Sequence, residues 1–298
     1  MNGHEDNSAR LNIVRWISAK LGRSRVVIQC KLRAIRIFIL DTPFFGKQIS
    51  KKSSMMGSIA QELDFGRLQD LFTYTKEPQE IWYISVAVVL EVNGHDEKVE
   101  ALWRYITHKH QEDASLLNMA RRLREAFLKT CALAGFPKGI QCLSALRKVI
   151  NETRPDLGKT LESDRSMRDS LSAEATEKRG EDFFRRIYQQ HTDPIIQSMR
   201  LSSGGDLDQF ALYSVYGELM SETSILSAKE TGLLEFTACY ASMSIAQAKG
   251  HMHGAKNLGA SKEEILGAVR LVDEMMPYVQ PAAFNSKAFP FLEKVKDW

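Results

Sequence analysis

The chain has 298 residues, of which 44% are apolar and 26% charged, and its net charge is +3. This is the composition of a globular protein that can bury one large or two modest hydrophobic cores. The strongest apolar run, Ile81 to Leu90, is about half as long as a membrane-spanning helix, so we expect no membrane partner.

The first 54 residues differ from the rest in charge. They contain 11 lysines and arginines against 3 acidic residues, a net charge of +8, and the remaining residues carry −5. Because this body has no cluster of basic residues, we expect no nucleic-acid partner. Residues 1–54 are interpreted as a basic extension, either disordered or an Arg-rich targeting presequence. The expected location is the cytoplasm, or the mitochondrion if the extension is a presequence.

From Ile59 onward the apolar pattern is mostly that of helices. Apolar residues three and four positions apart between Leu117 and Ala134 form one face of a helix. Gly135 predicts the end of that helix, and Pro137 predicts the first turn of the next. Ile81–Val92 has residues that suit a buried strand, but no second candidate strand exists to pair with it. We therefore interpret it as a buried helix.

The polar stretch 151–178 divides the predicted helices into two groups. It is rich in charged residues and is interpreted as a linker between an N-terminal helical half, residues 55–150, and a C-terminal domain, residues 179–298. In the C-terminal domain, Ser227 with Glu230 and Ser261 with Glu264 have the spacing of capping boxes, which mark helix starts.

Several short motifs occur in a fixed order in the C-terminal domain. They are the stretch LSAKETGLL at 226–234, then His251, Ala255, Gly259-Ala260-Ser261 and Glu263-Glu264-Ile265, with Arg179-Gly180 and Tyr216-Gly217 upstream. In this combination the chain resembles the carboxymuconolactone decarboxylase and alkylhydroperoxidase-D-like family, most clearly over residues 178–276. The segment from Arg122 to Pro137 resembles the later part of a family unit.

The resemblance implies an all-α, alkylhydroperoxidase-D-like fold, with two degenerate family-like halves. It also implies a homo-oligomer, a trimer or hexamer. Peroxidase members of the family place a CxxC pair before the motif histidine, but here those positions are Ser244 and Gln247, which cannot form a disulfide. The glutamate of the preceding helix aligns with Gly232. A two-cysteine peroxidase is therefore not expected.

His251 is the leading candidate for a catalytic residue, because the resemblance places it in the family motif and imidazole transfers protons near neutral pH. The alternative is a packed histidine without a catalytic role. Glu235 lies one turn after Gly232 and could replace the missing glutamate as a partner of His251, or be a carboxylate at the rim. His253 is two residues from His251 and points elsewhere on a helix, so no metal site is expected.

Three further residues are candidates for binding a substrate carboxylate. Lys256 and Arg270 flank the motif, and Tyr216 could reach the same site; the alternative for the two cations is simple exposure to solvent. The implied function is cofactor-independent acid/base chemistry, a decarboxylation or related lyase or isomerase step on a small carboxylate or lactone. The main alternative is a non-catalytic helical oligomeric scaffold. A less favoured one is a peroxidase that uses Cys239 alone.

Overall fold

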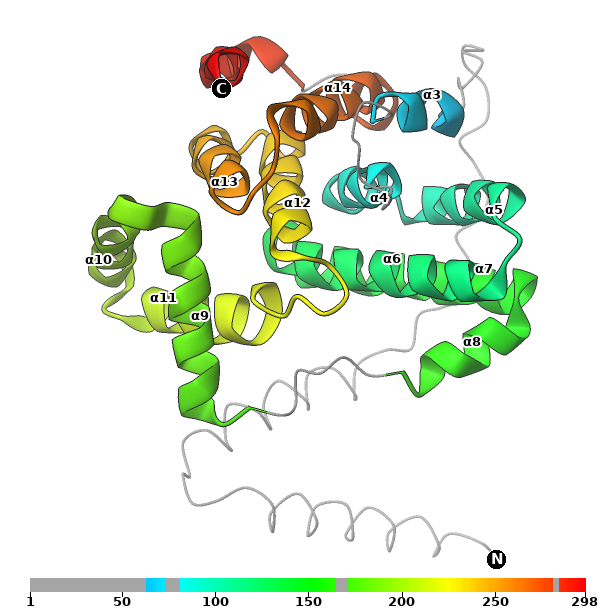
Figure 1. The fold of residues 1–298 in the computed structure, drawn as a ribbon, viewed down its shortest axis with the longest axis horizontal. Coiled ribbons are helices and arrows are strands. Elements are labelled where there is room, and N and C mark those ends of the chain that lie inside the picture. The colour runs from blue at the N-terminus through cyan, green and yellow to red at the C-terminus, as the bar shows by residue number, and fades with distance from the viewer. Residues whose placement is uncertain (1–62, 73–80, 165–170, 281–283) are drawn as a thin grey trace, which may run out of the picture. The chain divides into compact units, whose positions relative to one another are not determined.

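A computed structural model describes residues 63–72, 81–164, 171–280 and 284–298 (Figure 1). Every regular element in these ranges is a helix, which confirms the predicted all-α fold class. The basic extension, residues 1–54, lies outside the described residues. The alkylhydroperoxidase-D-like arrangement and the duplication stay predictions.

Short connections join most of the described helices. In chain order they are α3 (Phe65–Asp70), α4 (Trp82–Asn93), η1 (Asp96–Lys98), α5 (Val99–Lys109), α6 (Asp113–Ala134), α7 (Phe136–Thr153), α8 (Pro155–Glu162), α9 (Ala173–Tyr188), η3 (Gln189–His191), α10 (Thr192–Ser203), α11 (Asp206–Gln209), η4 (Phe210–Met220), α12 (Ala228–Ala241), α13 (Ile245–Asn257), α14 (Lys262–Val279), η5 (Ser286–Ala288) and η6 (Pro290–Asp297). Of these, η4 is a π-helix, whose backbone bonds span one residue more than those of an α-helix.

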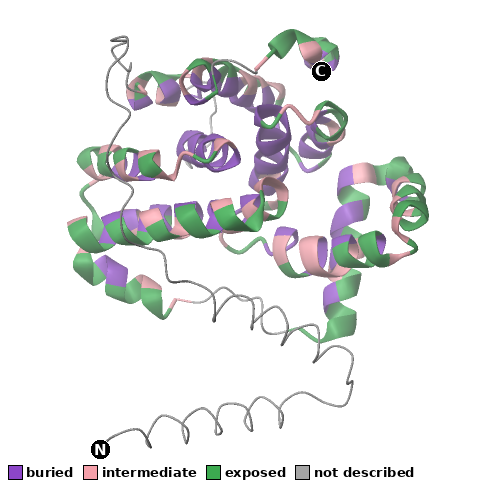
Figure 2. Cartoon of the chain, turned by 180° about the vertical axis from the view of Figure 1, so that it is seen from behind, coloured by how far each residue is buried: buried purple, intermediate pink, exposed green. Residues whose placement is uncertain are grey.

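Two helices, α4 and α12, form the centre of the larger hydrophobic core. All residues from Trp82 to Val92 on α4, and from Glu230 to Ala241 on α12, are buried (Figure 2). A helix that is apolar around its whole circumference is stable only when neighbours cover every side. Helices α6 and α14 pack against both of them and supply that cover.

The helix ends follow the local signals of the sequence. Capping boxes begin α12 at Ser227 and α14 at Ser261, as predicted. Helix α6 ends before Gly135, and Pro137 lies in the first turn of α7. The ambiguous apolar run is the helix α4, which confirms the helical interpretation.

A second, smaller hydrophobic cluster forms where α9 crosses η4. A Cβ on Gly180 would lie 1.9 Å from the carbonyl oxygen of Leu212, and one on Gly217 would lie 2.6 Å from that of Thr176. Only glycine permits backbones to approach this closely. Arg179 donates from Nε to the carbonyl oxygen of Gly217 at 3.0 Å. The Arg-Gly and Tyr-Gly pairs therefore hold two helices together.

The hydrophobic core crosses the stretch expected to be a linker. Within residues 151–178, helix α8 is formed and α9 begins at Ala173. Leu90, before this stretch, and Phe236, after it, belong to the same core. The described residues, from Leu63 onward, belong to one compact unit.

The acidic side chain of Glu91 lies inside this core without a hydrogen-bond partner among the described residues. Glu91 of α4 is fully buried, and neither of its carboxylate oxygens makes a hydrogen bond within the described ranges. A Cβ on Gly139 of α7 would lie 3.2 Å from its Oε1. Burial raises the pKa of Glu91 to about 9, against a smaller opposing effect of Lys138. At neutral pH Glu91 is therefore a neutral acid.

Candidate functional site

Helices α12 and α13 form a hairpin that places Glu235 opposite His251. Glu235 precedes Ser242 by seven residues, and His251 follows Ser244 by seven, so the two positions face each other across the turn. Nδ1 of His251 lies 3.6 Å from Oε2 of Glu235, and the side chains are only 7% and 1% exposed. The two predicted residues thus lie together in the interior.

Two tyrosines extend this pair. The hydroxyl of Tyr188, at the end of α9, lies 3.4 Å from Nε2 of His251 and 3.3 Å from the hydroxyl of Tyr216 on η4. The sequence places Tyr216 near His251 but gives no signal for Tyr188. In the structure two unusual backbone features mark the place: the π-helix itself, and Gln189, whose φ is +48°. Both features are common near functional sites.

The polar atoms of the cluster are not all satisfied. Glu235 Oε1 and His251 Nδ1 make no hydrogen bond within the described residues. The distance of 3.6 Å between the imidazole and the carboxylate is longer than a hydrogen bond. In this geometry Glu235 does not orient the imidazole by a direct hydrogen bond.

The thiol and the two phenol groups beside Glu235 have raised pKa values. Burial, and secondarily the charge of Glu235, raises the pKa of the Cys239 thiol to about 12. The same two causes raise the pKa of Tyr188 and of Tyr216. Cys239 is therefore a thiol rather than a thiolate at neutral pH, which does not favour a peroxidase that relies on it alone.

The structure does not bring the other two candidates to this cluster. Lys256 is exposed, and its ammonium lies over the ring of Trp298, 4.1 Å from the centroid. Arg270 is exposed on α14 and donates to the carbonyl oxygen of Leu71 at 3.4 Å. The two histidines also have different neighbours, since His253 packs against Trp298.

Of the three positions that the family resemblance aligns with peroxidase residues, Gly232 has a packing role in the structure. Ser244 precedes the first turn of α13, and Gln247 is exposed. A Cβ on Gly232 would lie 2.9 Å from Leu258 and 3.1 Å from the Cα of Ala255. Gly232 therefore lets α12 and α13 approach closely, and a glutamate would not fit there.

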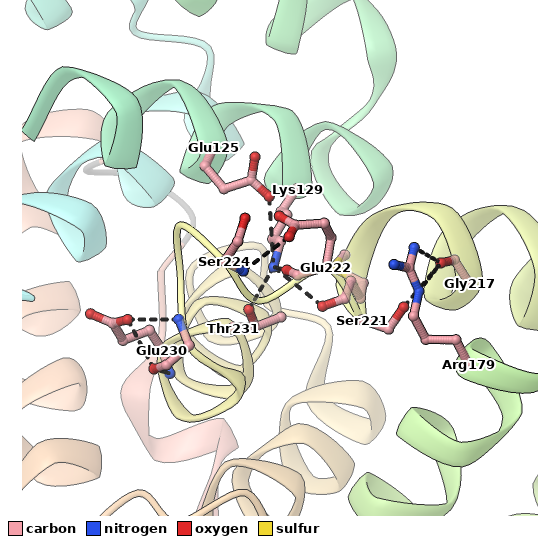
Figure 3. Close-up of polar contacts among 11 residues, drawn as sticks. Glu125, Lys129, Arg179, Gly217, Ser221, Glu222, Ser224, Glu230 and Thr231 are labelled. Carbon is pink, nitrogen blue, oxygen red and sulfur yellow. Dashed lines mark hydrogen bonds and ion pairs between the residues drawn. The ribbon is translucent and has the colours of Figure 1, made fainter. Parts of the chain in front are cut away.

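A buried lysine that the sequence analysis does not single out connects α6 to α12. Lys129 is fully buried and donates from Nζ to the carbonyl oxygens of Met220 (3.2 Å) and Glu222 (2.6 Å) and to Thr231 Oγ1 (2.7 Å). Its ammonium also lies 3.7 Å from Glu125 (Figure 3). All three N–H donors of the Lys129 ammonium are therefore used, and they hold the segment that precedes α12 in place.

A second buried ion pair lies beside it. Arg122 Nη2 lies 2.6 Å from Glu230 Oε1, and Nε donates to the hydroxyl of Tyr83 at 2.7 Å. Glu230 also closes the capping box with Ser227. The only sequence signal for these two buried ion pairs is the spacing of Arg122, Glu125 and Lys129 on one helix. The same spacing is equally typical of a solvent-exposed helix face.

Two absences apply to the described ranges. Among these residues, no three His, Cys, Asp or Glu side chains gather in a way that could hold a metal ion. No helix there combines the length and the apolar character needed to cross a lipid bilayer.

Comparison with known proteins identifies two fungal relatives. The chain is 32% identical over 155 residues to peroxisomal protein 2 of Schizosaccharomyces pombe, covering 52% of this chain and 68% of that protein. It is 24% identical over 261 residues to peroxisomal protein 2 of Saccharomyces cerevisiae, covering 69% of this chain and 90% of the relative. No family model matches the chain, and no solved structure matches it significantly.

These relatives overturn two expectations. Their name contradicts the predicted carboxymuconolactone decarboxylase or lyase function, and the alternative of a helical scaffold agrees with it better. The name also contradicts the expected cytoplasmic or mitochondrial location. That expectation used the basic composition of residues 1–54, and such a composition is not specific for one compartment. The family resemblance and the catalytic assignment of His251 and Glu235 stay predictions.

Proposed function

The chain belongs to the family of peroxisomal protein 2, and we propose that it acts in the peroxisome as a non-catalytic helical scaffold that assembles with copies of itself. The location rests on the names of its relatives. The scaffold function is supported by the closed interior of the fold, where Glu235 and His251 are buried and the polar network of Lys129 connects helices.

One observation carries the assembly: helix α10 packs on the smaller hydrophobic cluster through half-buried Ile195, Ile196 and Met199, but large apolar side chains of the same segment stay exposed. We call residues 192–210, which span α10, α11 and the start of η4, the α10 hairpin. Thr192 is the only buried residue of α10. Leu201 is 76% exposed, Leu207 44% and Phe210 59%. Large apolar side chains that stay exposed together on one segment are typical of a surface that a partner covers, so a partner surface is expected here.

The charges of the α10 hairpin favour a second copy as that partner. Asp193 pairs with Arg185 at 3.1 Å, and Asp208 pairs with Arg200 at 2.8 Å. Asp206 is then the one remaining charged side chain of the hairpin without an ion pair in the described residues. In a symmetric dimer the same patch meets itself, so a face with few uncompensated charges avoids like-charge repulsion.

Assembly is tested by removing the exposed apolar side chains. We expect the wild-type chain to sediment as an oligomer and the double variant Leu201→Ser, Phe210→Ser to sediment as a folded monomer in analytical ultracentrifugation. Phe136→Ser is the matched control, because Phe136 is 67% exposed on α7 and lies outside the hairpin. A monomeric wild type, or equal association of all three proteins, would rule out this interface.

The location is tested separately. A fluorescent fusion of the full chain, labelled at either end and expressed in Saccharomyces cerevisiae, is expected to coincide with a peroxisomal marker. Cells without peroxisomes serve as the control and should show diffuse fluorescence. Coincidence with a mitochondrial marker would contradict the proposed location while leaving the assembly prediction intact.

A further inference from the structure

A groove lies between α6, α7 and α8; we call it the α8 groove. Its volume is about 180 Å³. Most of its wall is aliphatic, with Leu143, Leu146 and Ile150 from α7 and Leu161 from α8. Since an apolar cavity of about 150 Å³ binds a benzene-sized molecule, the groove has room for an alkyl chain of about six carbons.

The walls of the α8 groove are fixed by contacts that involve no ligand. Arg124 of α6 donates to the carbonyl oxygen of Leu161 and to Asp164, both at 3.1 Å, and so ties the end of α8 to α6. On the other side, a Cβ on Gly158 would lie 1.9 Å from Oδ1 of Asn151, so α8 packs directly on α7. The groove is therefore preformed, as small-molecule sites usually are.

The charges around the groove favour an anionic head group. Arg121 and Arg124 share the single carboxylate of Asp164. Arg147 lies in the lining, is exposed, and has no ion pair or hydrogen bond within the described part of the chain. Glu162 is the one acidic residue of the lining. The lining itself thus holds two guanidinium groups, those of Arg124 and Arg147, against one carboxylate, and Arg147 is the one of the two without an ion pair in the described residues.

We infer that the α8 groove binds a straight-chain alkanoate, with its alkyl chain against the aliphatic residues of α7 and its carboxylate at Arg147. Burial of the alkyl chain supplies the affinity, and the guanidinium selects the charge of the head group. This binding site is independent of the Glu235–His251 cluster and goes beyond the proposed scaffold function.

The first test compares three ligands of equal chain length on the full-length protein. Isothermal titration with octanoate, 1-octanol and octylammonium should give the tightest binding for octanoate, with a dissociation constant on the order of 1 mM. Octanol should bind more weakly, and octylammonium most weakly. Absence of octanoate binding in the millimolar range, or equal binding of octanoate and octylammonium, would overturn the inference.

The second test locates the site. Arg147→Ala should weaken octanoate binding about threefold, the scale of one exposed ion pair, and leave octanol unchanged. Lys148→Ala is the matched control, since Lys148 is an exposed cation on α7 outside the groove lining, and it should change neither. Leu143→Trp, or Leu161→Phe if the first variant fails to fold, should abolish binding of both ligands. Unchanged binding in a folded filled-groove variant would place the ligand elsewhere.

Discussion

Replacing Glu91 by glutamine is expected to raise the free energy of unfolding at pH 8 by about 2–4 kcal/mol. The folded chain holds the proton of Glu91 up to a pKa of about 9, whereas the ordinary value is 4.5. Between these two pH values the unfolded chain releases a proton that the folded chain retains. The contribution of Glu91 to stability is therefore greatest below pH 4.5 and falls as the pH rises to about 9.

Urea unfolding at several values between pH 5 and pH 8 measures this effect. The difference in the free energy of unfolding between Glu91→Gln and the wild type should shrink to less than about 1 kcal/mol at pH 5. Near this pH the unfolded wild-type chain also retains part of its proton, whereas glutamine does not titrate at any pH. Glu177→Gln makes the same chemical change on the exposed surface of α9 and should leave the pH dependence unaltered. If Glu91→Gln and the wild type lose stability in parallel, Glu91 is ionised in the folded protein.

Replacing Lys129 by methionine is expected to lower the free energy of unfolding by about 3–5 kcal/mol at pH 7. Methionine keeps the length of the side chain but removes the ammonium that the carbonyl oxygens of Met220 and Glu222 accept from. It also leaves the buried carboxylate of Glu125 without this cation. These oxygens lose their hydrating water on folding. Without the ammonium they have no donor to replace that water, and the cost of burying them lowers the stability of the folded chain.

The control for this variant is Lys178→Met. Lys178 pairs with Asp182 at 3.3 Å on the exposed face of α9, and its loss should change stability by less than about 0.5 kcal/mol. The double variant Lys129→Met, Glu125→Leu should recover part of the loss, because it removes both charges of the buried pair. If Lys129→Met loses less than about 1 kcal/mol, its hydrogen bonds do not hold the segment before α12.

Helix positions were predictable because their signals are local. The capping boxes at Ser227 and Ser261 need only residues three apart, and Gly135 with Pro137 marks a helix end and a helix start within three positions. The helical state of α4 followed from the absence of a pairing strand. Each of these inferences depends on neighbours along the chain, whose geometry the backbone fixes.

The site was predictable only in part, because its remaining members come together through tertiary packing. Glu235 and His251 meet because one hairpin aligns them, but Tyr188 reaches His251 from the end of α9, at a position that belongs to none of the motifs. Lys256 and Arg270, which flank His251 in the sequence, make their contacts elsewhere. Proximity in sequence is a poor guide to which side chains lie together in the folded chain.

The motifs that support the family resemblance explain why the predicted function was wrong. Gly180 and Gly217 allow α9 to cross η4, and Gly232 allows α12 to approach α13. Ser227 with Glu230 begins a helix. These residues are needed for helix packing whatever the protein does, so such motifs predict architecture better than they predict chemistry.

The packing of α4 against α12 has a consequence for the synthesis of the chain on the ribosome. Residue 93 ends the first helix and residue 228 begins the second, so α4 leaves the exit tunnel long before its partner is made. At 5–20 residues per second, this delay is on the order of ten seconds. Throughout it, a nascent segment with no polar face is open to aggregation, which makes it a natural target for chaperones that shield emerging polypeptides.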